Sequence, residues 1–198
     1  MSQTSTDTDT GSVRVLPADP SRWDEVVAVM GEHGDAASCW CQYFRLRGRQ
    51  WTGSTREDNR DALEEQVCHG STPPGLVALL DGEPVGWCAV APKRDYPRVV
   101  ASRITGPDLD GIWAVTCFVV RPGFRRHGIA RAMLDAAVDF ARDRGARTVE
   151  GYPVDTAIST RASAGELYHG TLGMFTEAGF EIASRPTRTR ALVRRRLS

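Results

Sequence analysis

A nearly all-apolar segment followed by a loop rich in glycine and arginine constrains the fold of this chain more than any other feature. Residues 113–120 read WAVTCFVV, and an apolar, β-branched run of this kind is typical of a central strand covered on both faces. Residues 121–128 (RPGFRRHG) then form a loop, and an amphipathic helix is expected from there to Arg144 before Gly145 ends it. The order predicts the first half of a βαβ unit.

The remaining apolar runs predict further strands and helices on either side of this unit. The expected strands are 13–16, 76–80, 85–90, 148–152, 181–183 and 189–197, and the expected helices are 21–30, 54–67 and 172–178. Ser21 with Asp24, and Ser54 with Glu57, are spaced as in capping boxes. The pattern predicts one mixed α/β domain over residues 13–198, with an antiparallel N-terminal half. Residues 1–12 have almost nothing to bury and are expected to be a disordered tail.

Composition excludes several classes of function. Lys and Arg total 25 and Asp and Glu total 25, so the formal net charge is zero, which argues against a nucleic-acid or anionic-membrane binder. No segment approaches the ~20 apolar residues of a membrane span, and the N-terminus lacks signal-peptide features. The five cysteines are expected to be reduced, in a cytoplasmic protein. Cys39-x-Cys41 with scattered histidines has poor spacing for zinc, so no metal is expected.

The loop before the long helix is a candidate anion site. A helix N-terminus presents unpaired N–H groups and a positive dipole, and Gly128 allows close approach of the backbone. Four arginines surround this end: Arg121, Arg125, Arg126 and Arg131. The glycine spacing fits neither a P-loop nor a dinucleotide-binding loop. The plainer alternative is an ordinary strand-to-helix turn with surface arginines.

Residues 125–130 (RRHGIA) match the form Q/R-x-x-G-x-G/A and resemble the acetyl-CoA-binding motif of the GCN5-related N-acetyltransferases (GNAT). The segments FVVRP at 118–122, Gly-Ala at 145–146 and Ala-Gly-Phe at 178–180 are similar to that family's pattern and stand in register with the motif. The resemblance covers about residues 13–197. It implies the GNAT acyl-CoA N-acyltransferase fold: a mixed, mostly antiparallel sheet with splayed central strands and about four flanking helices.

The resemblance also implies where acetyl-CoA, the co-substrate, binds. The pantetheine arm would pair with the strand backbone, and a backbone N–H near Val119 or Val120 would polarise the thioester carbonyl. The pyrophosphate would lie on the N–H groups at the start of the helix. The implied cofactor-binding residues are Phe118, Val119, Val120, Arg125, Arg126, His127, Gly128, Ile129, Ala130 and Arg131.

Two catalytic residues common in the family are missing from this chain. Ala114 stands where many members have a glutamate, and Phe175 stands where many have a tyrosine. Glu150 is the best candidate base and Tyr152, on the same face, the candidate acid; Tyr168 is a weaker option. The alternative is that Glu150 pairs with an arginine or a backbone N–H for structural reasons.

The acceptor is expected to bind against residues 38–51, which lie in the least regular and most aromatic segment. An aromatic or amphipathic amine is the natural guess, although these aromatics could simply pack the helices together. Cys117 could accept an acyl group, but in an apolar strand it is more often a core residue. The candidate substrate-binding residues are Trp40, Tyr43, Phe44 and Trp87.

Together these features predict an N-acetyltransferase that moves acetyl from acetyl-CoA to the primary amine of a small molecule by direct attack on the thioester. A protein or peptide N-acetyltransferase is one alternative. A non-catalytic CoA-binding regulatory domain is another, since the usual glutamate and tyrosine are absent. A homodimer, common in the family, is possible.

Overall fold

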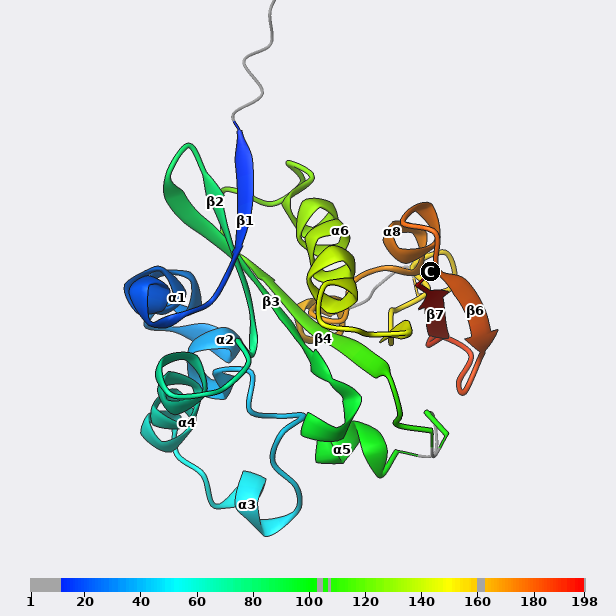
Figure 1. The fold of residues 1–198 in the computed structure, drawn as a ribbon, viewed down its shortest axis with the longest axis horizontal. Helices are drawn as coiled ribbons and strands as arrows, with labels where there is room; N and C mark the ends of the chain where they lie inside the picture. The colour runs from blue at the N-terminus through cyan, green and yellow to red at the C-terminus, as the bar shows by residue number, and fades with distance from the viewer. Residues whose placement is uncertain (1–11, 103–104, 107, 160–162, 198) are drawn as a thin grey trace, which may run out of the picture.

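A seven-stranded mixed sheet forms the centre of the computed structural model (Figure 1). The structure describes residues 12–102, 105–106, 108–159 and 163–197. The strands lie in the order β1-β2-β3-β4-β5-β7-β6, and all neighbours are antiparallel except β4 and β5, which are parallel. In chain order they are β1 (Val13–Pro17), β2 (Gly75–Leu80), β3 (Glu83–Pro92), β4 (Ile112–Val120), β5 (Thr148–Gly151), β6 (Glu181–Ser184) and β7 (Leu192–Arg196).

Helices cover both faces of the sheet. The α-helices are α1 (Trp23–Met30), α2 (Gly34–Cys39), α3 (Arg49–Thr52), α4 (Arg56–Cys68), α5 (Pro97–Val100), α6 (Ile129–Arg142), α7 (Ala164–Leu167) and α8 (Leu172–Glu177), and η1 (Pro20–Arg22) and η2 (Lys93–Asp95) are 3-10 turns. α6 and α8 lie on one side of the sheet, and α1, α2 and α4 lie on the other (Figure 1). No helix in the described ranges is long and apolar enough to cross a membrane.

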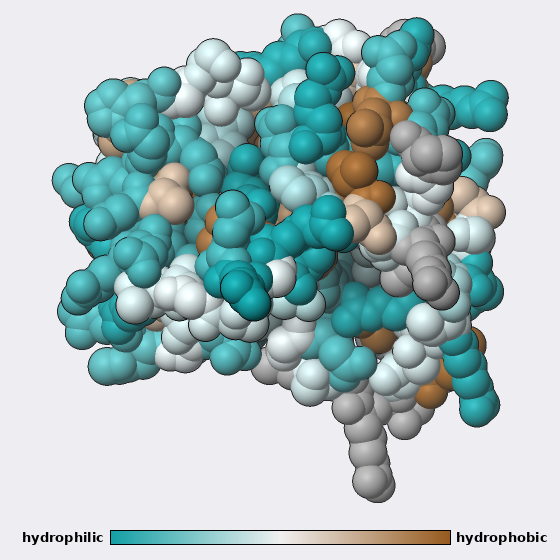
Figure 2. Space-filling view, turned by 90° about the horizontal axis from the view of Figure 1, so that it is seen from below, coloured by the Kyte–Doolittle hydropathy of each residue, from teal (hydrophilic) through white to brown (hydrophobic). Residues whose placement is uncertain are grey.

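Alternation along the strands divides the core between these two layers. On β3, Cys88 and Val90 face the α6 layer, whereas Trp87 and Ala89 face the α1 layer. β4 is buried on both faces, as its apolar sequence predicts. Seen from below, the surface is mostly hydrophilic, with hydrophobic side chains in small separate patches (Figure 2). Most buried apolar residues belong to the two core layers, and a smaller third cluster includes Tyr96 and Tyr152.

The predicted mixed α/β fold is confirmed, but two helix starts differ from the prediction. Ser21 does not open an α-helix: Asp19 accepts its N–H at 3.0 Å and caps the 3-10 turn, so α1 begins at Trp23. The second capping box is Thr55 with Asp58, one residue later than expected, and each side chain accepts the other residue's N–H. Residues 1–11 of the expected tail lie outside the described residues, while the N–H of Ser12 donates to Asp81.

The central strands separate where a bulge occurs. The register between β3 and β4 shifts after Ala89, which leaves Thr116 without a partner on β3. Pairing between β4 and β5 ends at Val115 and Gly151. Beyond that point the N–H of Phe118 donates to the carbonyl of Tyr168 at 2.6 Å instead. The expected splay is present, and the residues after α7 dock on the open edge of β4.

Candidate active site

The loop between β4 and α6 holds the helix N-terminus open. Gly128 is the N-cap with a φ of 74°, and no side chain caps the helix. The first helical bond runs from the N–H of Ala132 to Gly128 O. The N–H groups of residues 129–131 therefore lack intrahelical partners and can bind an anion. A Cβ placed on Gly128 would meet no heavy atom within 4 Å, so the space in front of this end is open.

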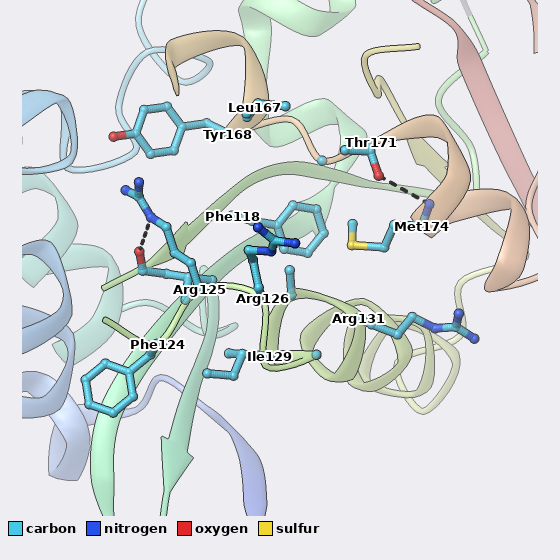
Figure 3. Close-up of a pocket in the computed structure, with 14 residues that line it drawn as sticks. Phe118, Phe124, Arg125, Arg126, Ile129, Arg131, Leu167, Tyr168, Thr171 and Met174 are labelled. Atoms are coloured by element: carbon cyan, nitrogen blue, oxygen red, sulfur yellow. Dashed lines mark hydrogen bonds between the residues drawn. The ribbon is translucent and has the colours of Figure 1, made fainter. Parts of the chain in front are cut away.

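This open end forms one side of a cavity of about 420 Å³, which we call the loop cavity (Figure 3). β4 and the segment after α7 form its other walls. It is lined by Phe118, Val120, Phe124, Arg125, Arg126, Gly128, Ile129, Ala130, Arg131, Leu167, Tyr168, Gly170, Thr171 and Met174. Most of the predicted cofactor-binding residues are therefore brought together here.

Three predicted residues do not line the loop cavity. Arg121 turns away to pair with Glu83 at 2.8 Å, so it does not join the other arginines. His127 is exposed outside the cavity, and Val119 points to the opposite face of β4. Among the arginines that remain, Arg125 donates from Nε to Val120 O at 3.3 Å (Figure 3).

A second cavity of about 410 Å³, the aromatic cavity, lies on the other face of β4. Tyr43 stands edge-on to both Phe44 and Trp51, with ring centroids 4.9 and 5.3 Å apart. Outside the cavity, the guanidinium of Arg98 lies 4.1 Å from the centroid of Tyr43. The lining residues are Asp35, Ala36, Ser38, Cys39, Cys41, Tyr43, Phe44, Trp51, Cys117, Val119, Gly165, Tyr168 and His169.

The predicted acceptor residues divide into two groups. Tyr43 and Phe44 line the aromatic cavity. Trp40 and Trp87 do not: they are 1% and 0% exposed and belong to the core under α1 and α4. For these two tryptophans the packing alternative fits the structure, because each ring is enclosed by neighbouring apolar side chains. Trp87 still supports the cavity wall by donating from Nε1 to Cys41 Sγ at 3.0 Å.

β4 separates the two cavities. Its side chains alternate, so Phe118 and Val120 line the loop cavity whereas Cys117 and Val119 line the aromatic cavity. Tyr168, half-buried at the open edge of the strand, lines both cavities. The two cavities are therefore neighbours, with Tyr168 between them, near the point where β4 leaves β5.

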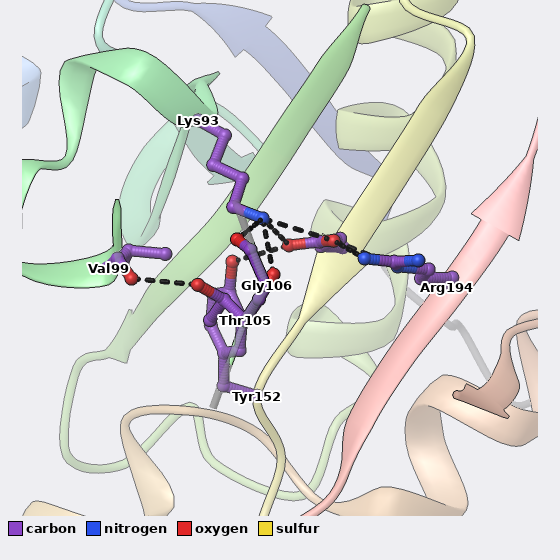
Figure 4. Close-up of polar contacts among 7 residues, drawn as sticks. Lys93, Val99, Thr105, Gly106, Tyr152 and Arg194 are labelled. Atoms are coloured by element: carbon purple, nitrogen blue, oxygen red, sulfur yellow. Dashed lines mark hydrogen bonds and ion pairs between the residues drawn. The ribbon is translucent and has the colours of Figure 1, made fainter. Parts of the chain in front are cut away.

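Glu150 and Tyr152 lie away from both cavities, in a largely buried ionic cluster (Figure 4). The Glu150 side chain is fully buried. Its Oε2 lies 3.1 Å from Lys93 Nζ and accepts from the Tyr152 hydroxyl at 3.0 Å. Its Oε1 accepts from Arg194, with Nη2 at 2.7 Å. Because both of its oxygens are occupied, Glu150 fits the alternative that it pairs with an arginine for structural reasons. Burial, together with the neighbouring Glu150 carboxylate, raises the pKa of Tyr152 well above its usual value.

His169 is the residue of the aromatic cavity that sequence reasoning missed. Its Nδ1 lies 3.1 Å from the carbonyl oxygen of Thr116, the bulge residue of β4. Burial lowers the pKa of His169 to about 4, and the nearby Arg190 contributes to this shift. Nothing in the local sequence, Tyr-His-Gly, indicates that this segment folds back onto β4.

Three cysteines also line the aromatic cavity: Cys39, Cys41 and Cys117. All five cysteines are free thiols. A hydrogen bond with Cys117, together with burial, raises the pKa of Cys41 well above its usual value, and burial raises that of Cys39 to about 11. Both therefore stay protonated at neutral pH and are poor nucleophiles. In the described ranges, no three His, Cys, Asp or Glu side chains are arranged to hold a metal.

Comparison with known proteins points to one family. The sequence matches the model of the acetyltransferase (GNAT) family over residues 40–173. A comparison with curated protein sequences gives no match.

Solved structures share the fold at low sequence identity. A GCN5-related N-acetyltransferase from Kribbella flavida is 18% identical with a TM-score of 0.54, and the alignment covers 93% of this chain and 98% of that one. YncA from Salmonella typhimurium, solved with acetyl-CoA, is 13% identical with a TM-score of 0.55, covering 94% of each chain. PaiA N-acetyltransferase from Thermoplasma acidophilum, solved with coenzyme A, is 10% identical with a TM-score of 0.53, covering 94% and 99%.

Proposed function

This chain belongs to the acetyltransferase (GNAT) family, and we propose that it transfers the acetyl group of acetyl-CoA to the primary amine of a small molecule. The observation that carries the proposal is the pair of cavities on opposite faces of β4, which meet at Tyr168. The loop cavity offers an anion site at a helix N-terminus. The aromatic cavity has apolar walls and a limited volume. Two reactants can therefore approach one point from opposite sides of the strand.

Acetyl-CoA fits the loop cavity. The free N–H groups of residues 129–131 suit the pyrophosphate, and Arg125 and Arg126 add positive charge beside them. The N–H of Phe118 is already bonded to Tyr168 O. Two residues further along the strand, Val120 directs its N–H to the same edge and is the better candidate for a backbone contact with the pantetheine arm.

The aromatic cavity is the proposed acceptor site. Its volume of about 410 Å³ suits a small molecule better than the long groove expected for a peptide. Tyr43, Phe44 and Trp51 provide flat apolar walls, and Asp35 provides a carboxylate that attracts an ammonium group. Asp35 is exposed, so its role is attraction of the cation rather than chemistry in a dry site.

The chemistry is aminolysis of a thioester. The nitrogen must lose a proton as its lone pair forms the C–N bond, and the electron pair of the C–S bond leaves with the CoA sulfur. Most of the acceleration would come from holding the two reactants in position. Tyr168, which lines both cavities, is placed to donate a proton to the departing sulfur.

Release of free thiol tests the proposal. Acetyl-CoA is incubated with the protein and a panel of small primary amines, and in parallel with lysine-containing peptides, and the acetylated product is identified by mass spectrometry. We expect thiol release with at least one small amine, matched by an equal amount of N-acetyl product. Turnover of peptides only would favour a protein acetyltransferase, and acetyl-CoA binding without any turnover would favour a regulatory domain.

A further inference from the structure

The ring of His169 is held in one tautomer by the main chain of β4. Its Nδ1 lies 3.1 Å from Thr116 O, and a carbonyl oxygen can only accept a hydrogen bond. Nδ1 therefore carries the proton, and in the neutral ring the free lone pair is on Nε2. The neighbouring contact from Phe118 N–H to Tyr168 O, at 2.6 Å, fixes the main chain next to this histidine.

The surroundings of His169 keep its ring neutral. The edge of Phe44 packs on it with centroids 5.3 Å apart, and burial lowers its pKa to about 4. Arg190 acts in the same direction, whereas Glu166 and the Thr116 carbonyl act against it. The other titratable groups of the aromatic cavity are Asp35, Cys39, Cys41, Tyr43, Cys117 and Tyr168. The combined effect on the pKa keeps the His169 imidazole neutral at any pH above about 5, so that Nε2 can accept a proton.

We infer that Nε2 of His169 accepts the proton that the acceptor amine loses during acetyl transfer. The inference rests on the proposed function, because it needs the amine to occupy the aromatic cavity. His169 lines that cavity and is anchored to the bulge of β4, where the strands separate and the two cavities meet. A base at this position lies between the acceptor site and the strand along which the thioester is expected.

The ammonium form of the acceptor first gives one proton to solvent, because only the neutral amine has the lone pair that attacks the acetyl carbon. As the nitrogen forms its bond to the acetyl carbon, its N–H becomes much more acidic than that of a free ammonium, so a weak base suffices. The proton moves to Nε2, and the C–S electron pair leaves with the CoA sulfur. Tyr168 donates its proton to the thiolate, and the imidazolium returns a proton to Tyr168 directly or through solvent, so both side chains end neutral.

The other candidate bases fit less well. Glu150 lines neither cavity, and both of its oxygens are engaged by Lys93, Tyr152 and Arg194. The thiol of Cys41 has a raised pKa and so remains protonated. Its Sγ also accepts the N–H of the buried Trp87.

The test uses two substitutions of His169 in the full chain. In His169→Gln the side-chain amide can still donate to Thr116 O but cannot act as a base. We expect kcat to fall about 100-fold, the scale of a lost general base, with the Kd for acetyl-CoA unchanged within about twofold. The matched control is His69→Gln, at an exposed histidine whose ring pairs with Glu65, and this variant should keep full activity.

In His169→Ala, added imidazole should restore part of the rate. The rescue should grow with the fraction of free-base imidazole as pH rises, and with the basicity of substituted imidazoles. A merely structural histidine would give a rescue that does not depend on basicity. That result, or an unchanged kcat in folded His169→Gln, would overturn the inference. If the unmodified protein releases no CoA with any amine, the proposed function itself has failed.

Discussion

The contacts of Glu150 fit a structural role for this buried charge better than the catalytic role that the sequence suggested. Lys93 is also fully buried, and its Nζ donates to Thr105 O at 2.8 Å as well as contacting Glu150. Removing one partner of a buried ion pair leaves the other charge without compensation. The cluster joins the end of β3 to β5 and β7, so its loss should loosen the sheet beside the splay.

We therefore expect Glu150→Gln to lower the free energy of unfolding by about 3 kcal/mol, measured by urea denaturation. The control is Glu64→Gln, which breaks an exposed pair with Arg60 and should cost less than about 1 kcal/mol. If Glu150→Gln keeps full stability but loses about 100-fold in kcat/KM, Glu150 is the base and the structural interpretation is wrong.

At the scale of elements, β4 and the segments around the aromatic cavity determine which acceptor fits. Among the residues that the structure describes, those that line the cavity include the carboxylate of Asp35 but no lysine or arginine. A carboxylate on the substrate would lie near Asp35 with no cation among these lining residues, and desolvating it would be costly.

Phenethylamine should therefore be a better acceptor than phenylalanine, which has the same ring and amine but adds a carboxylate. We expect at least a tenfold higher kcat/KM, which corresponds to about 1.4 kcal/mol, and Asp35→Asn should narrow the difference. Equal kcat/KM values for the two compounds would show that the acceptor binds elsewhere, or that solvent fully screens the substrate carboxylate from Asp35.

The sequence predicts features that depend on neighbouring residues, and it misses those that depend on contacts between residues far apart in the chain. The unit of strand, loop and long helix depends on neighbouring residues, and α6 indeed runs from Ile129 to Arg142. The Glu150 cluster joins residues 57 and 44 positions apart in the chain, and His169 reaches a carbonyl 53 positions away. Such contacts depend on how strands pair and where α7 packs, which local patterns do not determine.

At the scale of the whole molecule, β4 of the central sheet separates the two cavities. α6 aims its free N-terminus into the loop cavity on one face of β4, while α2 and the residues that follow it enclose the aromatic cavity on the other face. Where β4 separates from β5, Tyr168 lines both cavities. The central claim is that acetyl-CoA enters through the loop cavity and is held by the start of α6.

Calorimetric titration of acetyl-CoA into two glycine variants of the same loop tests this claim most directly. Gly128 and Gly123 both have positive φ, 74° and 92°, and both have open space where a Cβ would stand. Valine therefore strains the backbone similarly at each, but only Gly128 lines the loop cavity. The Kd should rise at least about tenfold in Gly128→Val and stay within about twofold of the unmodified value in Gly123→Val. Equal Kd values in the two folded variants would contradict the claim.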